Sequence, residues 1–438
     1  MKSATAISYE LDDIVKAAED LTSQIKSKFT FGKHTVALLF GQPDMEIGAL
    51  SAAVSRELGC HVVGGTTAAG ALLTNEGYHE LAIMLHVLSG DDCFFAVAIS
   101  DSLTADPEKK ISDAYREACR NLEEVYNGAS ADAGVDADTG VGTSADAGVD
   151  AGASAGADTG VGASAGAEPK MVVCVASIVP GIASDCILEK ISALCGNLPV
   201  FGFNAADDFE FSKQQVYLDG ETGGDRIAIL LLSGNVRPIF QTTNLAGKQA
   251  LEKRLVTKSR DNVICEIEGK PAFEYIKSFP FINDETTALF NYQFFVEMQN
   301  DVLNDGIPVS RALNTYDKET GEVTCFANVP ENSYIGLLYC DGNDVAKTSE
   351  AGIKDFLGKL QTTGGDYIYS TVLIATCSLR NMFLADMRET EGDLVKALMP
   401  PNLTTSGVYA FGEIAPTSIR GGEAVNRFHN ATFTLCAI

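Results

Sequence analysis

Four polar residues near the end of the sequence have side chains that could together bind a small molecule with two opposite charges. They supply a guanidinium, a carboxylate, an imidazole and an amide, on Arg380, Glu413, His429 and Asn430. An arginine fork binds a carboxylate through two parallel hydrogen bonds, and a glutamate can hold an ammonium group. The set could therefore satisfy both ends of an amino acid. In the structural alternative, Arg380 pairs with Glu413 across a sheet, and His429 and Asn430 cap a turn.

A second polar group lies in a turn near the middle of the chain and consists of Asn204, Asp207 and Asp208. These side chains could hold a cation or the ammonium group of a ligand. They could equally bond to the backbone of their own turn, as Asn and Asp side chains commonly do. Arg311 is either another charge near the same cleft or the solvated end of a strand.

Cys377, His429 and Glu413 are the residue types of a nucleophile, a base and an orienting group. A cysteine-dependent hydrolase or transferase is therefore the alternative function. However, Cys377 follows the apolar run 372–375, which is typical of a buried packing thiol. We therefore expect a protein that is not an enzyme. The sequence has no phosphate loop, dinucleotide fingerprint or zinc spacing, so we expect neither a cofactor nor a metal.

Two similar stretches organise the elements that must position these residues. Val62–Gly70 and Val200–Asp208 each run from β-branched or aromatic residues into a small-residue turn with glycine. A strand and then a helix precede each turn, and antiparallel strands follow it. A parallel start with an antiparallel finish predicts mixed sheets with helices on a face, which is an α+β fold.

The domain organisation follows from this repetition. We expect an N-terminal helix over residues 1–30, a duplicated domain over 31–244 and a second α+β module over 245–438. The two copies within the duplicated domain span about 35–127 and 170–236.

Residues 128–168 separate the two copies and are composed mainly of Ala, Gly, Asp, Ser, Thr and Val. Without aromatic residues or apolar periodicity, such a segment cannot offset the entropy of ordering, so we expect a disordered insertion. Near the end of the chain, the strands expected at 407–411 and 431–438 are separated by a long turn.

The charge and the apolar runs exclude several classes of partner. The net charge of −27 argues against a nucleic-acid backbone or an anionic membrane surface. No apolar run reaches the roughly 20 residues of a membrane-spanning helix, and the N-terminus has no secretory signal pattern. The cysteine count of 11 is odd and suggests reduced thiols. We therefore expect a cytoplasmic protein without membrane insertion.

The chain resembles the FIST domain family, and the resemblance covers almost everything outside residues 128–168. Five features carry it: the paired turns, Asp207-Asp208, the run Val216 to Gly220, Cys377 to Arg380, and Gly412 to Ile414 leading to His429 to Phe433. The last of these is the most specific. The family has an N-terminal and a C-terminal module and is regarded as sensing small ligands, amino acids among the candidates, in signal transduction.

The resemblance implies a stand-alone sensory protein that binds its ligand in a cleft between the two modules. Members are often fused to an output module, for which this chain has no room, so a signalling partner protein is expected. On this hypothesis the ligand-binding residues come from both polar groups: Arg380, Glu413, His429, Asn430, Asp207, Asp208, Asn204 and Arg311.

Overall fold

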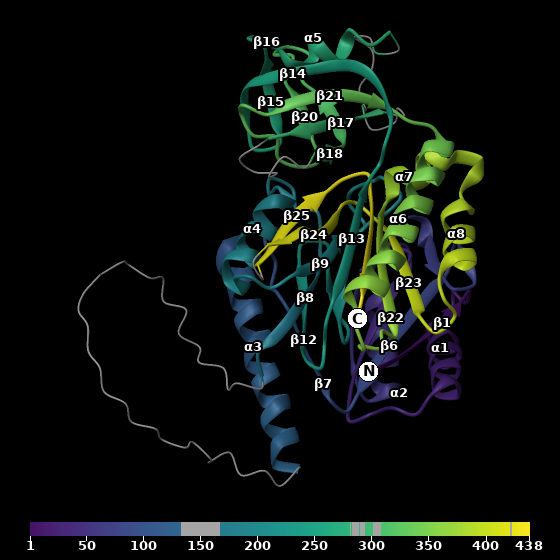
Figure 1. Cartoon of the computed structure of the whole chain (residues 1–438). Coiled ribbons are helices and arrows are strands. Elements are labelled where there is room, and N and C mark those ends of the chain that lie inside the picture. Colours follow the sequence, from purple (N-terminus) through teal and green to yellow (C-terminus); the bar gives the residue numbers. More distant parts are fainter. Residues whose placement is uncertain (133–166, 281, 283–288, 290–293, 301–307, 421–422) are drawn as a thin grey trace, which may run out of the picture.

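The chain builds three six-stranded mixed sheets and a separate curled sheet (Figure 1). The computed structural model describes residues 1–132, 167–280, 282, 289, 294–300, 308–420 and 423–438. The predicted insertion therefore lies largely outside the described residues. Its first five residues, 128–132, are helical and continue the preceding helix, which moves the predicted boundary.

The three six-stranded sheets share one plan, which identifies three structural units along the chain. In each sheet a parallel pair of strands is joined by helical connections, an antiparallel strand lies beside the first of the pair, and an outer strand lies beside that. A hairpin completes each sheet on the other side.

The first unit consists of β1 (Lys2–Ser8), α1 (Ile14–Lys28), β2 (His34–Gly41), α2 (Ile47–Leu58), β3 (His61–Thr66), η1 (Ala68–Gly70), β4 (Leu72–Thr74), β5 (Gly77–His79) and β6 (Ile83–Gly90). The second consists of β7 (Cys93–Ile99), α3 (Pro107–Asp132), β8 (Pro169–Ala176), α4 (Ser184–Cys195), β9 (Val200–Asn204), β10 (Val216–Leu218), β11 (Glu221–Gly223) and β12 (Ile227–Gly234).

The third consists of β13 (Ile239–Asn244), α6 (Gly342–Thr363), β22 (Thr371–Cys377), α7 (Ser378–Leu384), η3 (Ala385–Met387), α8 (Thr390–Leu398), β23 (Thr404–Ala410), β24 (Glu413–Arg420), β25 (Glu423–His429) and β26 (Thr432–Ala437). Between β13 and α6 lies the curled sheet, here called the half-barrel. It contains β14 (Lys248–Arg260), β15 (Val263–Ile267), β16 (Lys270–Pro271), α5 (Ala272–Lys277), β17 (Phe294–Gln299), β18 (Val309–Arg311), β19 (Leu313–Tyr316), β20 (Val323–Cys325) and β21 (Tyr334–Tyr339).

Each unit gives its hairpin to the sheet of another unit. Hairpin β4–β5 of the first unit pairs with β23 of the third, β10–β11 of the second pairs with β3 of the first, and β24–β25 of the third pairs with β9 of the second. The exchange is cyclic, so the three units form one body. We call it the three-unit body.

One glycine position recurs in all three units because the parallel pair leaves no room for a side chain there. Gly64, Gly202 and Gly407 each lie beside the first strand of their pair. A Cβ added at Gly64 or Gly202 would stand about 2 Å from a carbonyl oxygen of that strand, and at Gly407 it would stand 2.9 Å from Leu73. Glycine therefore allows the two parallel strands to lie close together at Gly64 and Gly202, and at Gly407 it makes room for Leu73 of hairpin β4–β5.

The core is layered because the buried strands alternate their side chains. Leu38 and Phe40 point into a central cluster shared by all three sheets, whereas Ala37 and Leu39 point to the outer cluster under α1 and α2. The same alternation places α3 and α4 outside the second sheet, and α6 and α8 outside the third. Figure 1 shows helices on the outside and the half-barrel above the sheets.

The α+β class and the mixed sheets are confirmed, and the repetition extends further than the sequence indicated. The predicted duplication is the visible part of a threefold repeat, whose third copy lies in the predicted second module. The long turn expected between 411 and 431 is wrong, because β24 and β25 form a hairpin there. The N-terminal helix is present as α1, and the strand β1 before it was not predicted.

Candidate functional site

A small pocket lies where the half-barrel meets the three-unit body, at the carboxyl ends of the parallel strands β22 and β23. This is the edge of an α/β sheet where ligands commonly bind. The cavity measures about 20 Å³, roughly the room that one water molecule needs. We call it the junction pocket; its lining is Phe209, Phe211, Ala312, Phe326, Cys377, Ser378, Leu379, Phe411 and Asn430.

The loop after β9 carries two of these phenylalanines and is held by Asp207. The Asp207 carboxylate is buried and accepts hydrogen bonds of 2.9 to 3.0 Å from the backbone N–H groups of residues 210–213. Phe209 and Phe211 have φ angles of 63° and 54°, a left-handed conformation that costs about 1 kcal/mol for each such residue. Asp207 therefore shapes a strained loop that places two rings in the pocket.

The other two polar residues of this turn also bond within the protein. Asp208 accepts a hydrogen bond of 2.8 Å from the backbone N–H of Ala69. Asn204 is buried and donates to Ser184 Oγ at 2.6 Å, at the start of α4, while its Oδ1 has no partner among the described residues. Only Asp207 therefore bonds the backbone of its own turn, as in the structural alternative, whereas Asp208 and Asn204 bond to the first unit and to α4.

Glu413 is the first residue of β24 and is fully buried. Its Oε2 accepts hydrogen bonds from the backbone N–H of Thr432 at 3.2 Å and from its hydroxyl at 2.6 Å. Its Oε1 has no hydrogen-bond partner within the described part of the chain. Burial raises the pKa of Glu413 to about 8, although Thr432 and the charge of Arg380 act in the opposite direction. The carboxyl group is therefore largely protonated at neutral pH.

His429 lies directly opposite Glu413 in the β24–β25 ladder. Its Nε2 is 3.2 Å from the carbonyl oxygen of Ala415, and its Nδ1 has no partner in the described residues. Burial lowers the pKa of His429 to about 3, so the ring is neutral. Asn430, the next residue, accepts a hydrogen bond of 3.3 Å from the backbone N–H of Ala312 in the half-barrel.

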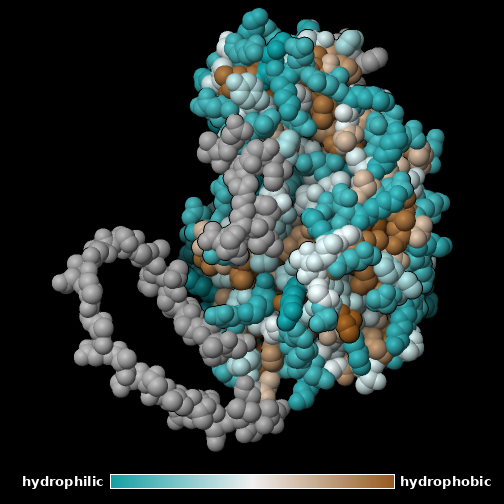
Figure 2. All heavy atoms as spheres, viewed as in Figure 1, coloured by the Kyte–Doolittle hydropathy of each residue, from teal (hydrophilic) through white to brown (hydrophobic). Residues whose placement is uncertain are grey.

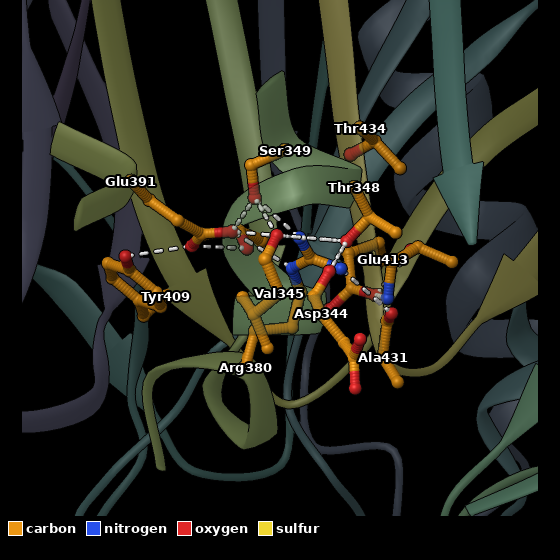
Figure 3. Close-up of polar contacts among 12 residues, drawn as sticks. Asp344, Val345, Thr348, Ser349, Arg380, Glu391, Tyr409, Glu413, Ala431 and Thr434 are labelled. Carbon is orange, nitrogen blue, oxygen red and sulfur yellow. Dashed lines mark hydrogen bonds and ion pairs between the residues drawn. The ribbon is translucent and has the colours of Figure 1, made fainter. Parts of the chain in front are cut away.

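Arg380 forms a buried ion pair with Glu391 of α8 and not the predicted pair with Glu413, although Glu413 lies near the guanidinium (Figure 3). Its Nη2 lies 2.9 Å from Glu391 Oε1, and its Nε donates to the same oxygen at 3.0 Å. Nη2 also donates to Ser349 Oγ of α6 at 2.6 Å. Nη1 donates to the carbonyl of Ala431 at 3.4 Å. The guanidinium thus ties α7 to α6, to α8 and to the last turn of the chain.

The carboxylate of Glu391 accepts hydrogen bonds from several residues. Besides Arg380 and Ser349, its carboxylate accepts hydrogen bonds from Tyr409 Oη at 2.9 Å and from Thr376 Oγ1 at 3.2 Å. Tyr409 and Thr376 lie at the ends of β23 and β22, next to the strand ends that line the junction pocket. Nε and Nη2 of Arg380 are used within this network, whereas Nη1 has one acceptor among the described residues, the Ala431 carbonyl. Binding a carboxylate with both nitrogens of the fork would therefore require Arg380 to give up a bond within the protein.

Arg311 is a second buried arginine whose donors are in use. It donates to the carbonyls of Asn328 at 2.8 Å and Phe428 at 3.0 Å, and it lies 3.4 Å from Asp185 Oδ1. Asp185 also accepts a hydrogen bond of 2.9 Å from the backbone N–H of Asn328. Arg311 therefore joins the half-barrel to α4 and to β25, and it is not the solvated strand end of the structural alternative.

Cys377 lines the pocket but lacks the character of a nucleophile. The residue is buried, and its pKa is raised well above the ordinary value, first by burial and then by the negative charge of Glu413. A protonated thiol is a poor nucleophile, and the base expected beside it, His429, is engaged with the Ala415 carbonyl.

The structure brings part of the predicted set together. Asn430 lines the junction pocket, and Glu413 lies close enough to the lining residue Cys377 to raise the pKa of its thiol. His429 lies opposite Glu413 in the ladder, whereas Arg380 and Arg311 are held by other partners. The sequence analysis did not identify Glu391, although the spacing of apolar residues in its helix indicated that this residue is buried. Glu391 stands three, four and seven residues before Leu394, Val395 and Leu398, so it belongs to the apolar stripe of its helix, where a buried acid needs a cation.

A larger groove of about 410 Å³ lies between β1 and hairpin β4–β5, and several of its polar side chains are already paired. Tyr9 Oη and Thr74 Oγ1 contact the two ring nitrogens of His79 at 2.7 and 2.8 Å. Gln24 bonds both the N–H and the carbonyl of Ile7, at 3.4 and 2.8 Å. The hydrogen bond between Tyr9 and His79 holds the sheet of β1 against the sheet that contains hairpin β4–β5. The smaller junction pocket is therefore the better candidate for ligand recognition.

The face of the molecule shown in Figure 2 has little apolar area that could bind a partner or a membrane. Figure 2 shows hydrophilic residues over most of the half-barrel and hydrophobic residues in smaller groups lower on the same face. In the described part of the chain, no helix combines the length and the apolar character needed to cross a membrane.

Comparison with known families gives two matches that lie end to end. A model described as the FIST N domain matches residues 35–270, and one described as the FIST C domain matches residues 272–416. Among curated proteins the comparison gives no match. The boundary between the two matches falls between β16 and α5, inside the half-barrel.

Proposed function

The chain belongs to the FIST family, whose domains sense small ligands, and from this premise we propose that it is a sensory protein that binds its ligand in the junction pocket. The observation that carries the proposal is a pocket at the carboxyl ends of β22 and β23 that is lined by four phenylalanines and by the polar residues Ser378 and Asn430. An apolar pocket with a few convergent polar groups is the usual form of a small-molecule site.

We propose an amino acid as the first ligand class to test, as expected from the sequence. Glu413 supports the ammonium half of such a ligand once it gives up its proton, because the ionised carboxylate then attracts the ammonium charge and its Oε1 accepts a hydrogen bond. The carboxylate half would require Arg380 to exchange its bond to Glu391 for one to the ligand.

Binding without catalysis is part of the same proposal. It is supported by the raised pKa of the Cys377 thiol and by the engagement of His429 with a carbonyl. We also propose a cytoplasmic location and a signalling partner protein. The location is supported by 11 cysteines that are all free, as is usual in a reducing compartment.

A thermal-shift screen tests the proposal. The panel contains amino acids, amines, carboxylates and sugars, and it is run on the wild-type chain and on Ala312→Met, which places a longer side chain in the junction pocket. We expect at least one compound to raise the unfolding temperature of the wild type and to leave that of Ala312→Met unchanged. A panel without any shift, or equal shifts in the two proteins, would contradict the proposal.

A further inference from the structure

The junction pocket is bordered by a cluster of four phenylalanine rings. The ring centroid of Phe211 lies 5.4 Å from that of Phe326 and 4.8 Å from that of Phe411. The centroid of Phe209 lies 5.4 Å from that of Phe411. Aromatic rings attract one another at such separations. A further flat ring could therefore take part in the same packing.

The lining of the pocket carries no charge in the described part of the chain. It includes no acidic or basic side chain there, and the Cys377 thiol stays protonated because burial raises its pKa well above the ordinary value. Asp207, which holds the neighbouring loop, has its carboxylate bonded to four backbone N–H groups. Burying a charge is costly unless it is paired. An ionised group of a ligand would therefore be destabilised in this pocket.

Asn430 gives the lining a hydrogen-bond donor. A backbone N–H can only donate, so the Asn430 atom that meets the N–H of Ala312 at 3.3 Å is the oxygen Oδ1. The NH₂ group of the same amide is not used in this contact, and Asn430 lines the pocket. Ser378, which also lines it, donates its own proton to the carbonyl of Ala410 at 2.9 Å. The ligand group that best complements Asn430 is therefore a hydrogen-bond acceptor.

The loop that carries Phe209 and Phe211 gives a ring a way into the pocket. Both side chains are only partly buried, and both residues have the strained left-handed backbone described above. The empty cavity of about 20 Å³ holds roughly one water molecule. An aromatic ring therefore enters only when one of these two phenylalanines moves aside, and it then replaces the displaced ring against Phe411.

We propose that the junction pocket binds an uncharged aromatic ring that carries a hydrogen-bond acceptor. The ring lies among the phenylalanines, and the acceptor bonds to the NH₂ group of Asn430. This inference rests on the proposed function and narrows its ligand class, since an amino acid would enter the pocket only with an aromatic side chain and would keep its charged groups outside.

Benzamide, benzoate and benzamidine test the inference, because they share one shape and are neutral, negative and positive at neutral pH. Isothermal titration of each into the full wild-type chain needs no variant. We expect saturable binding of benzamide and at least tenfold weaker binding of both ions. Cyclohexanecarboxamide, which carries the same amide on a saturated ring, should bind at least threefold more weakly than benzamide. Silence of benzamide, or equal or tighter binding of any of the other three compounds, would overturn the inference.

Asn430→Asp tests the assignment of the donor, because aspartate keeps the acceptor for Ala312 and replaces the NH₂ group with a second oxygen. We expect this variant to bind benzamide at least tenfold more weakly and benzamidine more tightly than the wild type does, with unchanged far-ultraviolet circular dichroism. The control Asn381→Asp changes an asparagine of α7 that bonds to Tyr78 Oη at 3.3 Å, and it should leave both affinities unchanged. An unaltered preference for benzamide in Asn430→Asp would overturn the inference.

Ala312→Met tests the location of the ring without changing Asn430. We expect this variant to lose benzamide binding, and binding that persists in it would overturn the inference. Silence of benzamide in the wild type, together with a shift by a charged compound in the thermal screen that Ala312→Met abolishes, would refute this inference and leave the proposed function standing.

Discussion

Arg380 and Glu391 form an ion pair that is completely buried, with Nη2 and Oε1 2.9 Å apart and both side chains at 0% exposure. Removing one partner of such a pair leaves an uncompensated charge in the core. We therefore expect Arg380→Met to lower the free energy of unfolding by about 3 to 5 kcal/mol. The control Arg388→Met breaks an exposed pair with Glu80 and should cost at most about 1 kcal/mol. Urea unfolding of the two variants measures both effects, and equal losses would refute the buried role of Arg380.

Asp207 should control the loop that closes the junction pocket. In Asp207→Asn one of the two carboxylate oxygens becomes an NH₂ group, so two of the four backbone bonds lose their acceptor. We expect a loss of about 1 to 3 kcal/mol and faster labelling of Cys377 by iodoacetamide, quantified by peptide mass spectrometry. Asp208→Asn, which affects one bond to Ala69, is the control. Identical labelling rates in all three proteins would show that the loop does not gate the pocket.

Glu413 should make the protein less stable as the pH rises. Its pKa is about 8 in the folded protein against an ordinary value of 4.5, so the folded state binds the proton more tightly. Stability from this group is present below about pH 4.5 and is lost between 4.5 and 8, by about 1.4 kcal/mol for each pH unit in that window. The gain in stability of Glu413→Gln over the wild type should therefore grow from pH 5 to pH 8. A pH-independent difference would contradict the burial of the unpartnered carboxyl group.

His86 should act in the opposite direction. It lies in the middle of β6, fully buried, and neither ring nitrogen has a partner among the residues described. Burial lowers its pKa from 6.5 to about 3, so the unfolded chain binds a proton below pH 6.5 that the folded chain does not. Between pH 6.5 and 5 the wild type should lose about 2 kcal/mol from this residue. Thermal unfolding of His86→Leu should lack this loss. If the stability of His86→Leu falls between pH 6.5 and 5 as much as that of the wild type, His86 is not the source of the loss.

The cyclic exchange of hairpins predicts that the N-terminal and C-terminal parts cannot fold apart. A fragment over 1–244 lacks hairpin β24–β25 for its second sheet, and a fragment over 245–438 lacks hairpin β4–β5 for its own. We expect neither fragment to unfold cooperatively alone, and co-expression to recover a soluble complex. Cooperative unfolding of either fragment by itself would contradict a single three-unit body.

Local patterns were sufficient to predict much of the fold. Helix α4 is the helix that the sequence predicted before the second turn, and it ends where its apolar stripe meets Gly196, which has a positive φ of 62°. Strand β8 and the two turns followed from their apolar runs in the same way. In contrast, local sequence patterns did not indicate which distant strands pair with each other. Strands β6 and β7 are adjacent in sequence but belong to different sheets, and β24 pairs with β9, which lies more than 200 residues earlier.

The residue types of the candidate site could be chosen from the sequence, but the partners of these residues could not. The sequence did not predict that Glu413, His429 and Arg380 are buried. The choice of Glu391 over Glu413 as the partner of Arg380 depends on where α8 packs against α6 and α7, which no spacing along the chain encodes. Likewise, Asp207 bonds to four backbone N–H groups because the loop turns around it, a geometry that appears only in three dimensions.

The central claim is that the junction pocket holds a small ligand, and native mass spectrometry tests it most directly. Wild type and Ala312→Met are purified in parallel from the same host under gentle conditions. We predict that the wild type carries an extra small mass, lost on mild activation, and that Ala312→Met does not. Spectra in which both proteins show only the bare chain, or in which both retain the same mass, would contradict the claim.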